Sequence, residues 1–244
     1  MLTASELLAT WEKGIDRPVF ERALLLLEAA SGLSSENLAE LSIGQRDARL
    51  FDLREAIFGS MLPCLTVCSA CGEQLELNLD VGDLRISPST PNEQRRGHFT
   101  MEAEGITLGF RLPNSLDLSV ASYAKDTDSA RTLLIERCLV DVNGQQKEVT
   151  SETLPPTVLD ALTVAMAEAD PQSHIELALT CPSCEQEWQA VFDIASYLWS
   201  EIQTWALRVL REVHILASVY SWREADILAL SPLRRQLYLE RVGA

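Results

Sequence analysis

Four of the six cysteines lie in two short, identically spaced pairs, Cys68 with Cys71 and Cys181 with Cys184. Two residues between cysteines allow both sulfurs to face one point from a tight turn. Two such turns supply four sulfurs at tetrahedral angles, about 2.3 Å from a metal, and leave no open coordination position. The sequence therefore predicts one structural Zn²⁺ site formed by these four cysteines, with no metal-bound water available for catalysis.

The residues that follow each pair also match when the two segments are aligned without a gap. Each unit reads as a strand, a turn with two cysteines, a second strand and an aspartate that can cap the next element. The matched positions are Cys68/Cys181, Cys71/Cys184, Leu75/Trp188, Leu77/Ala190, Leu79/Phe192, Asp80/Asp193 and Val81/Ile194. We interpret the two units as halves of a zinc ribbon, split by about 110 intervening residues, because loop-closure entropy grows only slowly with length.

Other interpretations of the paired cysteines are a redox-active pair, disulfides, or buried cysteines without a ligand. A thioredoxin-like pair needs its first cysteine at a helix N-terminus, whereas strand-like alternation follows both pairs here. Disulfides require an oxidising compartment, and nothing else in the sequence indicates one. Cys64 and Cys138 lie in apolar surroundings and are expected to be small core residues.

No catalytic constellation is visible elsewhere. His98, His174 and His214 are scattered, and none has a cysteine or serine partner at a motif spacing. Phosphate-binding glycine loops and the common hydrolase and metalloprotease motifs are not found. We therefore predict a protein that is not an enzyme and has no small-molecule substrate.

The formal net charge of −16 disfavours binding to nucleic acids and anionic lipid, which require clustered lysine and arginine. The longest apolar stretch near the N-terminus is much shorter than the roughly 20 residues of a membrane span. No basic, apolar leader precedes it, so a cytoplasmic protein is expected. With 47% hydrophobic residues, the chain can bury a core.

The elements that must position the cysteines are helices and hairpins. Helical periodicity and capping residues predict a helix capped by Ser5 and ending near Trp11, and a second that begins at Pro18 and ends near Gly32. A third is capped by Ser42 and ends at Gly59. Further helices are expected over residues 115–123, 126–139, 156–169, 195–219 and 232–242, hairpins over 65–79, 98–111 and 174–193, and a loop over 86–97.

This order predicts an α+β fold, mostly helical with short antiparallel hairpins, that includes the split zinc ribbon. The expected regions are a helical region at 1–60, ribbon halves at 61–85 and 174–194, an inserted α+β region at 86–173 and a C-terminal helical region at 195–244. The C-terminal region holds three of the five tryptophans, Trp199, Trp205 and Trp222, and is therefore the expected surface for binding a partner. At helical spacing, however, such tryptophans are more often core residues than contacts with a partner.

Several stretches together resemble a known family. They are residues 11–14 (WEKG), 18–27 (PVFERALLLL), 41–50 (LSIGQRDARL), 53–59 (LREAIFG), 111–118 (RLPNSLDL) and 220–231 (YSWREADILALS), with the two cysteine pairs. In these stretches the chain resembles baseplate proteins encoded with phage-tail-like contractile injection systems. Those proteins are in turn similar to the baseplate hub assembly chaperones of T-even phages.

The resemblance implies a cytoplasmic protein that binds baseplate hub or spike proteins, as an assembly chaperone or as a minor component of the assembled particle. Two alternatives are a zinc-ribbon module that binds nucleic acid or acts in transcription, and a thiol oxidoreductase that uses one of the cysteine pairs. The first predicts a basic face, and the second predicts thiol exchange that requires Cys68.

Overall fold

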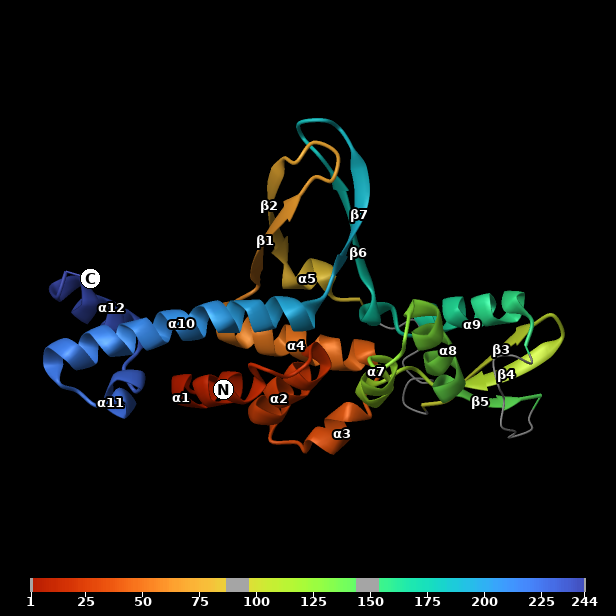
Figure 1. The fold of residues 1–244 in the computed structure, drawn as a ribbon, viewed down its shortest axis with the longest axis horizontal. Helices are drawn as coiled ribbons and strands as arrows, with labels where there is room; N and C mark the ends of the chain where they lie inside the picture. The colour runs from red at the N-terminus through yellow and green to blue at the C-terminus, as the bar shows by residue number, and fades with distance from the viewer. Residues whose placement is uncertain (1, 87–96, 144–153, 244) are drawn as a thin grey trace. The chain divides into compact units, whose positions relative to one another are not determined.

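The structure is a computed structural model that describes residues 2–86, 97–143 and 154–243. Over these residues it combines helices with three small antiparallel sheets, which confirms the mixed class predicted from the sequence (Figure 1). The chain divides into two compact units. Met1–Leu33 and Ala195–Ala244 form the first, and Ser34–Ile194 forms the second. Most of the predicted loop at 86–97 lies outside the described residues.

The first unit is helical and draws on both ends of the chain. It contains α1 (Ala4–Gly14), α2 (Val19–Ser31), α10 (Ile194–Tyr220), α11 (Glu224–Leu228) and α12 (Pro232–Arg241). The predicted boundaries at Pro18, Gly32 and Ser231 are confirmed. The prediction that Ser5 caps α1 is wrong. Thr3 is the cap, because its hydroxyl accepts from the Glu6 N–H while the Glu6 carboxylate accepts from the Thr3 N–H.

The core of this unit depends on a close contact between α1 and α10. A Cβ atom placed on Gly14 would lie only 2.4 Å from Cη2 of Trp199, so only glycine permits this approach. The Arg22 guanidinium lies over the same indole ring, 4.8 Å from its centroid. Other buried side chains here are Leu7, Leu8, Trp11, Ala23, Leu26, Leu27, Leu198, Ile202, Val209 and Leu216.

The second unit begins with α3 (Ser35–Ala39) and α4 (Ile43–Phe58), and a short helix, α5 (Val81–Leu84), follows the first hairpin. Ser42 caps α4 in a reciprocal pair with Gln45, and Gly59 ends the helix, as the sequence predicts. The guanidinium of Arg54 is buried and donates to the Gly59 carbonyl at 2.5 Å.

Between the two cysteine hairpins lies an α+β region with its own core. Its sheet has the order β3–β4–β5, from β3 (Phe99–Ala103), β4 (Ile106–Phe110) and β5 (Leu139–Val142). Its helices are α7 (Ser115–Ala121), α8 (Thr127–Cys138) and α9 (Pro156–Ala169), and a 3₁₀ turn, η2 (Pro171–Ser173), follows. Phe99, Leu108, Phe110, Leu112, Ile135, Leu154, Val158 and Leu162 are buried together.

The hairpin turn at Glu104 and Gly105 is confirmed by positive φ at both residues, as a two-residue turn requires. Strand β5 was not predicted. The helix expected to reach residue 139 ends at Cys138, and Leu139 pairs with Phe110. This strand forms only because β4 offers a neighbouring edge, which is a tertiary condition.

A buried carboxylate joins the helices of this region to its sheet. Asp117 is fully buried and lies 2.5 Å and 2.8 Å from the two terminal nitrogens of Arg111. It also accepts from Nε of Arg137 and from the Asn114 N–H. Burial would raise the pKa of Asp117, but the hydrogen bonds from Arg111, Asn114 and Arg137 outweigh it and lower the pKa.

The two cysteine hairpins are β1 (Met61–Val67) with β2 (Gln74–Asp80), and β6 (Ile175–Thr180) with β7 (Glu187–Phe192). Leu62 and Leu75 lie on the buried face of the first hairpin. Leu65 and Val67, whose alternation helped to predict the strand, lie on the opposite face and are 60% and 56% exposed. The apolar period in β1 therefore does not mark its core side.

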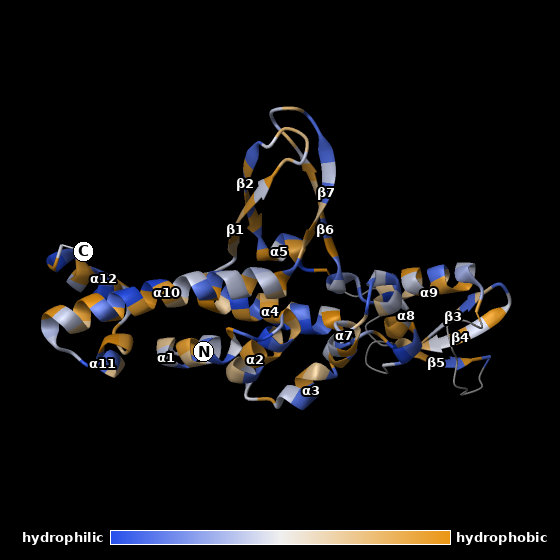
Figure 2. Cartoon of the chain, in the orientation of Figure 1, coloured by the Kyte–Doolittle hydropathy of each residue, from blue (hydrophilic) through white to orange (hydrophobic). Residues whose placement is uncertain are grey.

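No helix among the described residues is both long and apolar enough to cross a membrane. The longest, α10, shows hydrophilic and hydrophobic residues interleaved along its length (Figure 2).

Candidate metal centre

The two hairpins have the same strand register. In the first, Leu62 pairs with Leu79, and in the second, Ile175 pairs with Phe192. Ile175 lies as many positions after Leu62 as Cys181 lies after Cys68, and the same is true of Phe192 and Leu79. The gapless alignment of the two sequence segments is thus also a structural equivalence.

The turns that carry the cysteines, here called the knuckles, repeat the same backbone hydrogen bonds. The Cys68 N–H donates to the Glu73 carbonyl and the Cys181 N–H donates to the Gln186 carbonyl. The carbonyls of both first cysteines then accept from the residue after the second cysteine, Gly72 or Glu185. Both of these residues have positive φ, +78° and +58°. Equivalent positions therefore hold a glycine in one knuckle and a glutamate in the other.

The knuckles bring all four predicted ligands together. The sulfur atoms of Cys68, Cys71, Cys181 and Cys184 lie within 4.8 Å of one another. Two close contacts between sulfur atoms cross between the hairpins: Cys68 lies 3.7 Å from Cys184, and Cys71 lies 3.6 Å from Cys181. A disulfide bond is about 2.05 Å long, so none of these contacts is a disulfide.

The first cysteine of each knuckle is buried and the second is exposed. Cys68 and Cys181 are each 1% exposed and pack with Leu75, with the half-buried Trp188 against them. Leu75 and Trp188 are themselves equivalent positions in the two hairpins. A small apolar cluster made of matched residues therefore supports the inner side of the four sulfurs.

The surroundings of the thiols differ in their electrostatics. Backbone N–H groups of Cys71 and Ala70 lower the pKa of the Cys68 thiol to about 7. The Glu73 N–H lowers the pKa of the Cys71 thiol, but contact with Cys184, burial and the other sulfurs raise it to about 12. The Gln186 N–H lowers the pKa of the Cys184 thiol, but burial and contact with Cys181 and Cys68 outweigh it, so the net shift is upward. Contact between the sulfurs therefore disfavours the thiolate form of Cys71 and Cys184 where no cation lies between them.

The arrangement fits a tetrahedral metal ion. Four sulfurs at tetrahedral angles around a metal, each at about 2.3 Å, lie about 3.8 Å from one another. The two contacts between hairpins, at 3.6 Å and 3.7 Å, are close to this edge length. With all four positions filled by cysteine sulfur, such a site holds the hairpins together and has no place for a substrate or water.

The remaining cysteines and the histidines lie elsewhere. Cys138 is buried in the inserted region, 4.0 Å from a carboxylate oxygen of Asp117, and burial raises the pKa of its thiol to about 12. The Cys64 sulfur contacts the Leu62 carbonyl. His98 lies beside Asp141 and His174 beside Glu176, as partly exposed pairs of one histidine and one carboxylate.

The structure separates the three tryptophans of the C-terminal region into a core residue and two that are less buried. Trp199 is only 3% exposed and belongs to the core of the first unit. Trp222 is half-buried and stacks on Tyr220, with Tyr238 against the edge of both rings. The tryptophan argument for a contact surface therefore applies at most to Trp205 and Trp222, and the surface itself stays a prediction.

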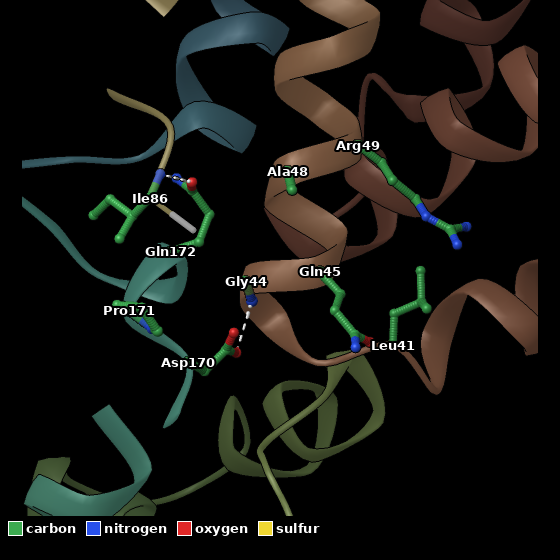
Figure 3. Close-up of a pocket in the computed structure, with 9 residues that line it drawn as sticks. All are labelled: Leu41, Gly44, Gln45, Ala48, Arg49, Ile86, Asp170, Pro171 and Gln172. Atoms are coloured by element: carbon green, nitrogen blue, oxygen red, sulfur yellow. Dashed lines mark hydrogen bonds between the residues drawn. The ribbon is translucent and has the colours of Figure 1, made fainter. Parts of the chain in front are cut away.

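A separate pocket of about 400 Å³ lies at the start of α4 (Figure 3). Its polar groups are mostly bonded within the chain: the Gly44 N–H donates to Asp170, and Gln172 bonds the Leu84 carbonyl and the Ile86 N–H. Burial raises the pKa of Asp170, although the Gly44 N–H and Ser42 lower it. The pocket is thus lined by residues at the start of α4 and by residues at the two ends of the inserted region. No motif in the sequence predicted it.

Comparison with protein families gave a match. The family described as "T4 bacteriophage base plate protein" matches residues 25–199, which is more than half of the chain and includes both knuckles. Neither curated proteins nor solved structures gave a match.

Proposed function

The chain belongs to the T4 bacteriophage base plate protein family, and from that premise we propose that it is a non-enzymatic assembly factor or minor component of a baseplate hub or spike. It would act in a contractile tail or injection system by binding other baseplate proteins. The family match is the observation that carries the proposal. The matched residues include both hairpins and the inserted region, which supports a role for this part of the chain in the baseplate.

The metal in this proposal is one structural Zn²⁺ per chain. Four cysteine sulfurs in tetrahedral reach are the donor set of structural zinc sites, and also of mononuclear iron. Because no ligand position is left open, the ion would stabilise the hairpin pair rather than perform chemistry. Metal binding would also offset the conformational entropy lost when the long chain segment between the two knuckles is closed into a loop. Both effects support a purely structural role.

The binding role is tested with hub, spike and tube proteins of a contractile particle from the same source, each purified separately. We expect a stable complex with at least one hub or spike protein in size-exclusion chromatography at physiological salt. If none of these proteins forms a complex with the folded, metal-loaded chain, the proposed function is wrong.

The metal is tested by elemental analysis of protein purified without chelators. We expect about one zinc and no stoichiometric iron per chain, since there is one four-sulfur site. Cys181→Ser should lose the metal and the cooperative unfolding of the hairpin pair, whereas Cys64→Ser, outside the site, should keep both. Metal retained in full by Cys181→Ser would contradict the assignment of ligands.

A further inference from the structure

The two hairpins are structurally equivalent, so each serves as a control for the other. In both hairpins the knuckle supplies two cysteines to the four-sulfur site, and the inner face supplies a residue to the small apolar cluster. A difference on their outward faces is not required by the metal or by the packing. Such a difference indicates a role that only one hairpin has.

The outward face of the first hairpin is apolar along β1. Met61, Leu65 and Val67 are 52%, 60% and 56% exposed, and with the exposed Pro63 they occupy the alternate positions of β1 that face outward. The positions that match Leu65 and Val67 in the second hairpin are Ala178 and Thr180. Single exposed apolar residues are ordinary on protein surfaces, but a row of large ones on one strand is typical of an interface.

Acidic side chains border this row. Across the strand pair, Leu65 faces Glu76 and Met61 faces Asp80, on the same face of the hairpin. Glu73 lies at the end of the turn, and residues 61–80 contain no lysine or arginine. The position that matches Glu76 in the second hairpin is Gln189. The second hairpin is also acidic, with Glu176 and Glu187 on its outward face, so the apolar row rather than the charge distinguishes the first hairpin.

We propose that the row Met61, Leu65 and Val67, bordered by Glu76, docks an apolar segment of another baseplate protein that carries lysine or arginine. Apolar side chains of this segment would cover the row, and its cations would face Glu76 and the acidic turn. This surface rests on the proposed function and specifies one contact through which the chain acts.

Charge decides between this occupant and others. A second copy of the chain would bring another net charge of −16 against an acidic face. Nucleic acid and anionic lipid carry the same sign as the hairpin and are repelled for the same reason. A strand added along the whole edge of β1 is also disfavoured, because Pro63 has no N–H to donate.

The test makes the first hairpin resemble the second. Leu65→Ala with Val67→Thr places the residues of the second hairpin at the matched positions. Both side chains are exposed, so metal content and unfolding temperature should stay close to those of the parent chain. Affinity for the hub or spike protein that binds the parent chain should fall about tenfold or more, because central apolar contacts dominate such interfaces.

Two further variants separate apolar from electrostatic contributions. Glu76→Lys should weaken binding as well, and raising the salt concentration should weaken the parent complex but have less effect on the Glu76→Lys complex. Val191→Thr, which removes an exposed apolar residue from the second hairpin, is the matched control and should bind like the parent chain. Tiled peptides of the bound protein should locate binding in a segment with apolar residues and lysine or arginine.

The outcomes distinguish the two proposals. If the parent chain binds no baseplate protein, both proposals are overturned. If it binds and the Leu65→Ala/Val67→Thr variant binds equally well, only the docking surface is wrong. Two results would show that the proposed occupant is wrong. One is binding of an acidic peptide to this surface, and the other is a dimer of the parent chain that the Leu65→Ala/Val67→Thr variant does not form.

Discussion

The residue after the second cysteine of each knuckle gives the sharpest test of the structure. Gly72 and Glu185 occupy equivalent positions with positive φ, a conformation that costs an L-residue about 1–2 kcal/mol and costs glycine almost nothing. A Cβ atom at Gly72 would have no other atom within 4 Å, so substitution there introduces no clash. The effect of Gly72→Ala is therefore a backbone effect alone.

The two reciprocal substitutions should have opposite signs. Alanine also restricts the unfolded chain, which offsets about 0.4–1 kcal/mol, so Gly72→Ala should destabilise the metal-bound second unit by about 1 kcal/mol. Glu185→Gly should stabilise it by up to about 1 kcal/mol, because it removes the same strain and pays the reverse entropy term. For a unit of this size, 1 kcal/mol corresponds to about 2–4 °C in Tm.

The assay is thermal unfolding at saturating zinc, followed by competition for the metal with a chelator of known affinity. Because the knuckle conformation is needed to present the sulfurs, metal affinity should fall about fivefold in Gly72→Ala and rise in Glu185→Gly. Exchanging the two residues, Gly72→Glu with Glu185→Gly, should nearly restore the parent stability. Shifts of the same sign in both single variants, or no shift in Gly72→Ala, would refute the equivalence of the knuckles.

Three other predictions follow from buried groups. Asp117→Asn should destabilise the second unit by about 3 kcal/mol in urea unfolding, because it leaves Arg111 and Arg137 without their buried carboxylate; a loss below about 1 kcal/mol would contradict the network. Burial raises the pKa of Asp47 to about 6, although Arg46 beside it lowers the pKa. The folded state therefore binds the proton more tightly than the unfolded chain does. This group's contribution to stability falls as pH rises from about 4, near the unfolded pKa, to about 6. Between pH 5 and 7 the parent chain should lose roughly 1 kcal/mol relative to Asp47→Asn, and parallel pH profiles of the two proteins would refute this. Gly14→Ala should destabilise the first unit by about 1–3 kcal/mol in thermal unfolding, because the new methyl group meets Trp199, and an unchanged Tm would show that α1 and α10 are less closely packed.

The sequence by itself determined the elements whose signals are local. Capping serines, a C-terminal glycine and helical periodicity placed α4, α9 and α12, because these signals act over three or four residues of backbone. The repeated cysteine spacing also predicted which four sulfurs would come together, since a tight turn fixes each pair and the repeat identifies the partner. The glutamate with positive φ at residue 185 could have been found in the same way, from its alignment with Gly72.

Only the tertiary structure decided features that depend on distant neighbours. The outward direction of Leu65 and Val67 was not visible in their alternation, because period two gives two faces and only packing chooses the buried one. Strand β5 exists because β4 pairs with it, and Asp117 is buried because two arginines converge on it. Helices from both ends of the chain form one compact unit for the same reason: the apolar surface that each must bury belongs to residues far away in the sequence.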